Sequence, residues 1–277
     1  MRVLKFLAWS NWIISLGAAL LASTTWIRFG LPVKYDVLLF IFLSTLLVYT
    51  FQRILKFLYI KQHPELYNWC VKHYKFLIVQ CVLALLALIP LINYLPVIVL
   101  YALLTSAVFS LLYLFVSPFS LKISGLRHLP FLKSILISVV WAIVTAIVPL
   151  LCFGNVAISQ ADISWVYIEH MLFIYALTIP FDVRDMQLDS EKMKTLPQVA
   201  GEKNARIIGS VLLLTFLLVT ELLNAPRPLP VLFVYGVTAM LLLYPAKNKS
   251  FWFYLYLIDG MIYLYAFLFW LIYWFLG

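Results

Sequence analysis

The sequence predicts an all-α fold: a polytopic bundle of about nine membrane-spanning helices with the N-terminus in the cytoplasm. Of the 277 residues, 65% are hydrophobic and 11% are charged, and the mean hydropathy is +1.02. A soluble domain is about 45–50% apolar and about 25% charged. The 20 basic and 11 acidic residues cannot cover the surface of so many large apolar side chains, so the excess apolar surface must face lipid.

Apolar runs of about 20 residues, which is the length that spans the hydrocarbon core, recur along the whole chain. We expect the spans at residues 6–27, 37–59, 76–93, 96–116, 134–152, 163–181, 207–223, 229–244 and 251–275. The first run follows two basic residues, as in a signal peptide, but its length and the runs after it predict an uncleaved span. No linker interrupts the series, so residues 1–277 are expected to form a single domain.

The basic residues give an independent test of this topology. With a cytoplasmic N-terminus and nine alternating spans, only Arg28, Lys34 and Arg227 of the 20 basic residues fall outside the cytoplasmic segments. The positive-inside rule predicts this asymmetry, and a wrong helix count would have scrambled it. The expected location is therefore the cytoplasmic membrane of the cell, as a multi-pass protein in contact with membrane lipid.

The net charge of +9 is explained by this topology, so a nucleic-acid partner is not expected. The three cysteines have unrelated spacings and no CxxC pattern, which fits small apolar side chains rather than a redox or metal site. The four histidines show no ligand spacing, so we expect neither haem nor zinc.

Acidic residues concentrate after the sixth predicted span, in FDVRDMQLDSEKMKTLP. On a helix, Asp182, Asp185 and Asp189 fall within a stripe about 60° wide. Three carboxylates so close repel one another, and charge near lipid is costly. Magnesium would relieve the repulsion, because it binds hard carboxylate oxygens and commonly bridges protein to phosphate. The alternative is a solvated helix end, but negative charge there opposes the helix macrodipole. The pattern favours metal or phosphate chemistry.

The longer segment FDVRDMQLDSEKMKTLPQVAGEKNAR resembles the second aspartate-rich motif of the UbiA superfamily of membrane prenyltransferases. Members often read D-x-R-D-x-x-x-D, followed by a basic residue, T-L-P or T-L-A, a glycine and an alanine. The matching residues are Asp182, Arg184, Asp185, Asp189, Lys194, Thr195, Leu196, Pro197, Gly201 and Ala205. The nine helices of that family, with this motif at the cytoplasmic end of the sixth, agree with the topology above.

The resemblance implies transfer of an isoprenyl chain from its diphosphate to a lipophilic acceptor, such as an aromatic quinone precursor. The reaction would take place in a cavity open to the bilayer, near the cytoplasmic face. Asp182, Asp185 and Asp189 would be the catalytic residues that hold Mg²⁺ against the diphosphate. Arg184 and Lys194 would neutralise its oxygens.

The first motif of the family, N-D-x-x-D-x-x-x-D, should close the second span, where this chain reads LLVYTFQRILKFLYIK. A frame that starts at Tyr49 puts Thr50, Arg53 and Phe57 where the acids belong. In one interpretation, Arg53 and Lys56 bind the diphosphate directly in place of metal. In the other, diphosphate handling is lost and the protein binds or moves a polyprenyl lipid. A small-molecule transporter is a third, less favoured class.

Polar residues inside the spans complete the candidates. A carboxylate within a span suggests function by default, so Asp259 in the last span is a substrate-binding candidate. Asn11 in the first span could line a cavity or hydrogen-bond across helices. Glu169, His170 and Glu221 are expected near the outer ends of their helices, in contact with interfacial water. The many aromatic residues of the last span are interpreted as lipid-facing bulk and interfacial anchors.

Overall fold

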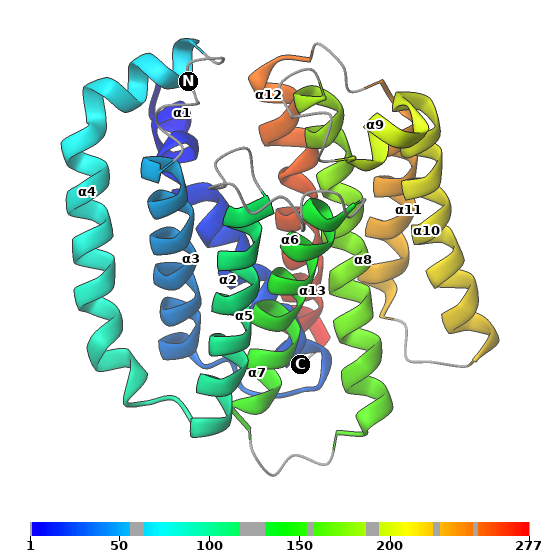
Figure 1. Cartoon of the computed structure of the whole chain (residues 1–277). Coiled ribbons are helices and arrows are strands. Elements are labelled where there is room, and N and C mark those ends of the chain that lie inside the picture. The colour runs from blue at the N-terminus through cyan, green and yellow to red at the C-terminus, as the bar shows by residue number, and fades with distance from the viewer. Residues whose placement is uncertain are drawn as a thin grey trace.

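The structure is a computed structural model that describes residues 2–55, 64–116, 131–153, 158–186, 194–223, 228–245 and 249–276. These residues form helices and no strands, which confirms the all-α class for the described part of the chain. Figure 1 shows the helices running roughly side by side, with the N-terminus at one end of the bundle and the C-terminus toward the other.

The first half of the bundle comprises α1 (Arg2–Trp9), α2 (Trp12–Arg28), α3 (Tyr35–Leu55), α4 (Pro64–Ile92) and α5 (Val97–Val116). The fifth predicted span consists of α6 (Leu132–Ala142), the π-helical turn η3 (Ile143–Ile147) and α7 (Val148–Leu151). The remaining elements are α8 (Gln160–Asp185), α9 (Leu196–Ala200), α10 (Glu202–Leu222), α11 (Leu229–Leu243), α12 (Phe251–Phe253), the π-helical turn η5 (Tyr254–Ile258) and α13 (Gly260–Leu276).

Several helices have the length and the apolar composition that a membrane span needs. Among the described residues there are six, or up to seven if the bent pair α1 and α2 forms one span. Two shorter apolar helices lie at Val97–Leu112 and Leu229–Leu243. The chain is therefore a multi-pass membrane protein. The count of nine spans and the cytoplasmic N-terminus stay predictions.

The first predicted span is broken rather than continuous. The axes of α1 and α2 differ by 71°, and Asn11 between them has a positive φ of 68°. A break inside lipid exposes backbone groups that need partners. The amide of Gln80 on α4 supplies one, since its Nε2 donates to the carbonyl of Ser10 at 3.0 Å. This bend was not predicted, because neither glycine nor proline stands there in the sequence.

Helix α4 also differs from its prediction. The span was expected from residue 76, yet the helix begins at Pro64 and includes the polar stretch before it. His73 has non-helical dihedral angles (φ −110°, ψ 18°) and marks a kink between that polar first part and the apolar remainder. The amphipathic start of α4 can remain helical because its backbone groups are paired within the helix.

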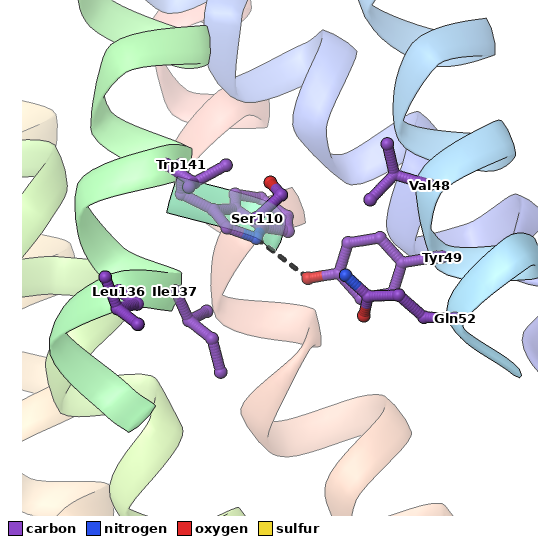
Figure 2. A pocket seen from close by; sticks show the side chains of 8 residues that line it. Val48, Tyr49, Gln52, Ser110, Leu136, Ile137 and Trp141 are labelled. Atoms are coloured by element: carbon purple, nitrogen blue, oxygen red, sulfur yellow. Dashed lines mark hydrogen bonds between the residues drawn. The ribbon is translucent and has the colours of Figure 1, made fainter. Parts of the chain in front are cut away.

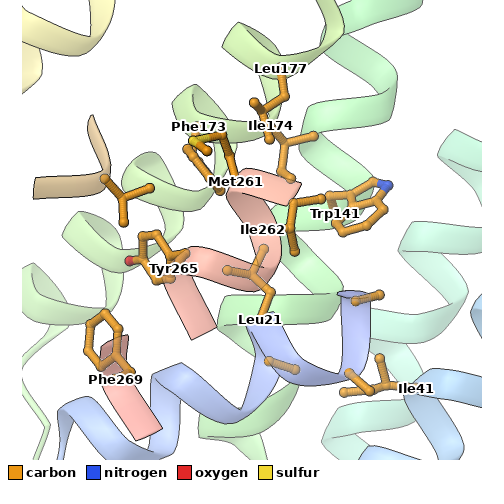
Figure 3. Packing of buried hydrophobic residues seen from close by; sticks show 14 of the residues in the cluster. Leu21, Ile41, Trp141, Phe173, Ile174, Leu177, Met261, Ile262, Tyr265 and Phe269 are labelled. Carbon is orange, nitrogen blue, oxygen red and sulfur yellow. The ribbon is translucent and has the colours of Figure 1, made fainter. Parts of the chain in front are cut away.

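Helix α8 is largely buried and packs mainly against α6 and α10, while α13 packs mainly against α2. In the apolar stretch of α8, 61% of the residues are buried, against 22% in the peripheral α4. Figure 3 shows the packing of Phe173 from α8 with Tyr265 and Phe269 from α13. The ring centroids of Phe173 and Tyr265 are 5.3 Å apart, in the range of favourable aromatic pairs. Residues on α8 therefore lie between the two halves of the chain.

Two π-helical turns interrupt helices of the bundle, η3 between α6 and α7 and η5 between α12 and α13. Such turns occur frequently at functional sites. The turn η5 ends immediately before Asp259, whose backbone N–H donates to the carbonyl of Tyr254, five residues earlier, at 2.9 Å. This extra residue in the turn changes the direction in which the start of α13 presents its side chains. It sets Asp259 toward the interior of the bundle.

Candidate functional site

A cavity of about 810 Å³ lies among the helices. It extends from the end of the bundle that carries α1 and the starts of α4 and α12 toward its middle (Figure 1). Charged side chains line the part near that end. Apolar side chains such as Ile174 and Ile262 line it further in. On α8, Ile174 precedes Asp182 by eight residues, or about 12 Å of helix at 1.5 Å per residue. The cavity is therefore charged at one end and apolar at the other.

Most of the candidate residues meet in this one cavity. The residues that line it and that the sequence had singled out are Asn11, Arg53, Asp182, Arg184, Asp185 and Asp259. They come from four separate parts of the chain, so their proximity is a property of the fold. Lys194 does not line the cavity; it has a positive φ of 46°, and its carbonyl accepts from the N–H of Phe131 at 3.1 Å. Lys56 and Asp189 lie outside the described residues.

Asp182 is buried and paired with the first turn of α6. The Nζ of Lys133 lies 3.0 Å from its Oδ1, and the hydroxyl of Ser134 donates to its Oδ2 at 2.5 Å. The side chain of Asp182 is 4% exposed and that of Lys133 is 12% exposed. The N-terminal turn of α6 also favours a carboxylate through its macrodipole. Lys133 was missed as a site residue, because the sequence presented it only as one more basic residue at a span end.

Asp185 holds Arg184 in a bidentate ion pair. Nε and Nη2 of Arg184 donate to the two carboxylate oxygens at 2.7 and 2.9 Å. The guanidinium carbon lies 5.1 Å from the ring centroid of Phe181 and 5.0 Å from that of Tyr254. Fork geometry and cation–π contacts together fix the plane of the guanidinium. The side chain of Arg184 nevertheless remains 37% exposed, so it is accessible from the cavity.

Arg53 contributes a cation from α3. Its Nη1 donates to the carbonyl of Trp9, at the end of α1. The last carbonyls of a helix have no partner within the helix, so Arg53 satisfies one of them. Within the described ranges, no carboxylate lies within ion-pair distance of Arg53. Lys249 also lines the cavity, with Nζ 4.6 Å from the ring centroid of Tyr244.

The carboxylates described here do not fit a magnesium site as they are arranged. Both oxygens of Asp182 are engaged by Lys133 and Ser134, and both oxygens of Asp185 are engaged by Arg184. Magnesium requires several oxygen ligands in near-octahedral geometry. In the part of the chain that the structure describes, no group of three or more His, Cys, Asp or Glu residues could hold a metal. The magnesium ion that the resemblance implies therefore stays a prediction.

Asp259 and Asn11 line the cavity from other parts of the chain than Asp182. Asp259 lines the cavity and is close enough to Arg184 for an electrostatic interaction. Asn11 lines it too, but its Nδ2 donates to the hydroxyl of Thr50 at 3.2 Å. This bond joins the bend between α1 and α2 to α3. Asn11 is thus a structural residue of the cavity wall, whereas Asp259 is positioned to meet a ligand.

A smaller pocket of about 80 Å³ adjoins the cavity between α3, α5 and α6 (Figure 2). Tyr49, Gln52, Ile137 and Trp141 line both spaces. The indole N–H of Trp141 donates to the hydroxyl of Tyr49 at 2.9 Å. This bond joins α3 to α6 and forms part of the wall between the charged cavity and the side of the bundle covered by α5.

A second group of charged residues lies deeper in the bundle, and we call Arg28, Glu169, Tyr235 and Tyr265 the Glu169 cluster. Nη1 of Arg28 donates to Oε2 of Glu169 at 2.7 Å, and the two side chains are 5% and 2% exposed. The hydroxyl of Tyr265 donates to the other carboxylate oxygen, and that of Tyr235 donates to the backbone carbonyl of Glu169. The expectation that Glu169 reaches water is wrong, because Glu169 is buried and paired with Arg28. Arg28 lies on α2, 141 residues away in sequence.

His170, the next residue along α8, is buried as well, at 1% exposure. Its Nδ1 pairs with the hydroxyl of Thr145 in η3 at 2.8 Å. The carbonyl of Thr145 accepts from the hydroxyl of Thr25 on α2 at 2.8 Å. The prediction of water contact is therefore wrong for His170 too, whereas Glu221 is exposed. Buried polar groups with complete partners of this kind hold helices in register.

Comparison with protein families, curated proteins and solved structures finds no match to this chain.

Proposed function

We propose that the protein is an intramembrane prenyltransferase, which transfers an isoprenyl chain from its diphosphate to a lipophilic acceptor. The observation that supports this most is the shape and charge of the cavity of about 810 Å³. Its charged end brings Arg184 and Asp185 of the D-x-R-D segment together with Arg53 of α3. Its apolar part offers room for a hydrocarbon chain. A molecule with a phosphate head and an isoprenoid tail matches both parts.

In this proposal the diphosphate occupies the charged end, beside Arg184 and Arg53. Breaking the allylic C–O bond leaves its electron pair on the diphosphate, and cations fixed nearby stabilise the charge that develops there. The acceptor then forms a bond to the isoprenyl carbon and releases a proton. Asp259, which also lines the cavity, is the residue we assign to the acceptor or to its proton. Aromatic faces such as that of Trp141 favour the intermediate cation.

The alternative is a relative that has lost catalysis and binds or moves a polyprenyl lipid. One observation favours it: Asp182 and Asp185 are already paired with basic residues of the same chain. Metal-dependent ionisation of a diphosphate would have to disturb both pairs. This alternative keeps the same cavity and the same lipid class, but it forms no product.

The two functions are separated by a product assay on the purified protein in lipid nanodiscs. We expect radiolabelled farnesyl or geranylgeranyl diphosphate to yield a new lipid and inorganic pyrophosphate when an extract of membrane lipids supplies the acceptor. Asp259→Asn should reduce the yield while the diphosphate still binds. Binding without pyrophosphate release would support the lipid-binding alternative. If prenyl diphosphates do not bind at all, the prenyltransferase function is contradicted, and only the alternative in which diphosphate handling is lost would remain.

A further inference from the structure

The small pocket of about 80 Å³ between α3, α5 and α6 adjoins the charged cavity and has no part in diphosphate binding as proposed above. Resting on the proposed function, we infer that this pocket is the subsite for a polar substituent of the acceptor. The substituent is a neutral hydroxyl or carbonyl group, bound by the carboxamide of Gln52 and the hydroxyl of Ser110. The body of the acceptor lies in the large cavity. The acceptor is therefore a lipophilic phenol, alcohol or ketone.

The two polar side chains of the small pocket are the first reason. Gln52 on α3 and Ser110 on α5 both line the pocket and are half-buried (Figure 2). Among the described residues, neither side chain has a hydrogen-bond partner. One turn earlier on α5, the hydroxyl of Ser106 donates to a backbone carbonyl of its own helix at 3.0 Å, which is the usual arrangement for serine in a helix. An unpaired amide or hydroxyl is costly in apolar surroundings, so a ligand that pairs with both is favoured.

The chemistry of the lining is the second reason, because it determines the kind of substituent. No charged side chain is found among the described residues that line the small pocket. A carboxylate or a phosphate would have no counter-charge there, and burying an unpaired charge is costly. A carboxamide and a hydroxyl can each donate and accept. A ligand hydroxyl can donate to Gln52 and accept from Ser110, and a ligand carbonyl can accept from both.

The size of the pocket limits how much of the acceptor enters it. Water occupies about 30 Å³ in the liquid, and a protein cavity of about 150 Å³ binds benzene. A pocket of about 80 Å³ therefore holds a substituent but not a whole aromatic ring. The adjoining cavity of about 810 Å³ has room for the apolar body of the acceptor.

The position of Gln52 is the third reason, because it brings the acceptor close to the diphosphate. Gln52 lines both the small pocket and the cavity, whereas the next residue, Arg53, lines the cavity alone. Successive residues of a helix point about 100° apart. Helix α3 thus presents its carboxamide to one space and its guanidinium to the other. An acceptor held by Gln52 has its body beside the diphosphate that Arg53 is proposed to bind, and transfer requires this proximity.

The test is a calorimetric titration of the whole protein in nanodiscs with naphthol, methylnaphthalene and naphthoate, all substituted at the same ring position. The three probes share a ring and differ only in the hydroxyl, methyl or carboxylate group. Empty nanodiscs correct for partition of each probe into lipid. We expect naphthol to bind roughly tenfold more tightly than methylnaphthalene, which corresponds to about 1.4 kcal/mol. Naphthoate should bind more weakly than naphthol, because the small pocket offers no cation.

Variants assign this preference to the small pocket. In Gln52→Met/Ser110→Ala, naphthol and methylnaphthalene should bind with equal affinity. Val140→Phe is a second variant, which fills the pocket from α6 and leaves both polar side chains in place, and it should lose the preference as well. Gln160→Met is the matched control, since it removes a carboxamide from an exposed position on α8 that lines neither space. Binding of farnesyl diphosphate should be unchanged in every variant, which shows that each one is folded.

The outcomes are distinct. Naphthol binding no tighter than that of methylnaphthalene in the wild type would overturn the inference. A preference for naphthol that survives in the double variant would overturn it too, and so would naphthoate binding as tight as that of naphthol. In each case, normal binding of farnesyl diphosphate would leave the proposed function standing. Failure of the wild type to bind farnesyl diphosphate would instead contradict the prenyltransferase function itself.

Discussion

Helix α8 carries acidic residues at its C-terminal end and, at Glu169, in its N-terminal half, and the two places differ in what surrounds them. At the Glu169 cluster, Glu169 and Arg28 are almost fully buried, and two tyrosine hydroxyls donate to Glu169. At the other end, Asp182 and Asp185 are also paired with basic residues, but both line a cavity of about 810 Å³. The comparison teaches that buried charge alone does not mark a binding site. Space beside the charge is also required.

Because of this difference, we expect substitutions at the Glu169 cluster to affect mainly the stability of the fold, and substitutions at the cavity to affect mainly ligand binding. Removing one partner of a buried ion pair costs about 3–5 kcal/mol, because the other charge is left uncompensated. At the cavity, water or a ligand can reach the charged residue that remains after its partner is removed. The same kind of change should therefore lower the free energy of unfolding less and weaken ligand binding more.

The first prediction concerns which membrane side each end of α8 faces, an all-or-none effect. A reporter active only in the cytoplasm should signal when fused after residue 61, 122 or 203, and stay silent after residue 155 or 277. The Asp182 end would then be cytoplasmic and the Glu169 end would face outward. Signal at residue 277 would require an even number of spans and would contradict the nine-span topology.

The second prediction is a large loss of stability at the Glu169 cluster. Glu169→Ala should lower the free energy of unfolding by about 3–5 kcal/mol, because it leaves Arg28 buried without a carboxylate. The measurement is thermal or denaturant unfolding in detergent, with Glu221→Ala as the control at an exposed position. The double variant Arg28→Met/Glu169→Leu should recover much of the loss. Equal stability of Glu169→Ala and the control would show that the pair does not support the fold.

The third prediction applies the same kind of change at the cavity. Arg184→Ala should weaken binding of farnesyl diphosphate by roughly ten- to a hundredfold, since a charge-assisted bond contributes about 1.5–3 kcal/mol. Arg184→Lys should recover only part, because an ammonium group cannot form the fork. Unfolding temperature should fall less than for Glu169→Ala. An unchanged dissociation constant in Arg184→Ala would remove Arg184 from the binding site.

The smallest effect is expected at the bend between α1 and α2. Asn11→Ala removes the hydrogen bond to Thr50, which contributes about 0.5–1.5 kcal/mol, and puts a less tolerant residue at a positive φ. Asn11→Gly loses the same bond but accepts the backbone conformation. Unfolding of the two variants should therefore rank glycine above alanine in stability. The reverse order would indicate that the bend does not depend on the dihedral angles of residue 11.

The sequence predicted the helical class, the multi-pass membrane character and the grouping of Asp182, Arg184 and Asp185 at one end of a helix. Hydropathy and charge distribution act over whole segments, so they are visible in the sequence. The D-x-R-D spacing likewise placed three charged residues on adjacent turns. These features depend on neighbours within one helix.

The sequence did not predict the features that depend on partners far along the chain. Lys133 approaches Asp182 from a different helix, and Arg28 approaches Glu169 across 141 residues. Hydropathy cannot distinguish a basic residue that faces headgroups from one that pairs with a buried acid. The bend at Asn11 was missed for the same reason, because its polar partners, Gln80 and Thr50, come from two other helices.

The most direct test of the contrast between the two ends is one thermal-shift experiment on the wild type, Arg53→Ala and Glu169→Gln. Farnesyl diphosphate at a hundredfold excess over its Kd should stabilise the wild type by about 2.7 kcal/mol. Arg53→Ala should unfold only a little below the wild-type temperature without ligand, because it loses the bond to the carbonyl of Trp9, and should lose most of the shift on adding ligand. Glu169→Gln should unfold at a lower temperature and keep the shift. An undiminished shift in Arg53→Ala, or a lost shift in Glu169→Gln, would contradict the assignment of binding to the cavity end and of stability to the Glu169 cluster.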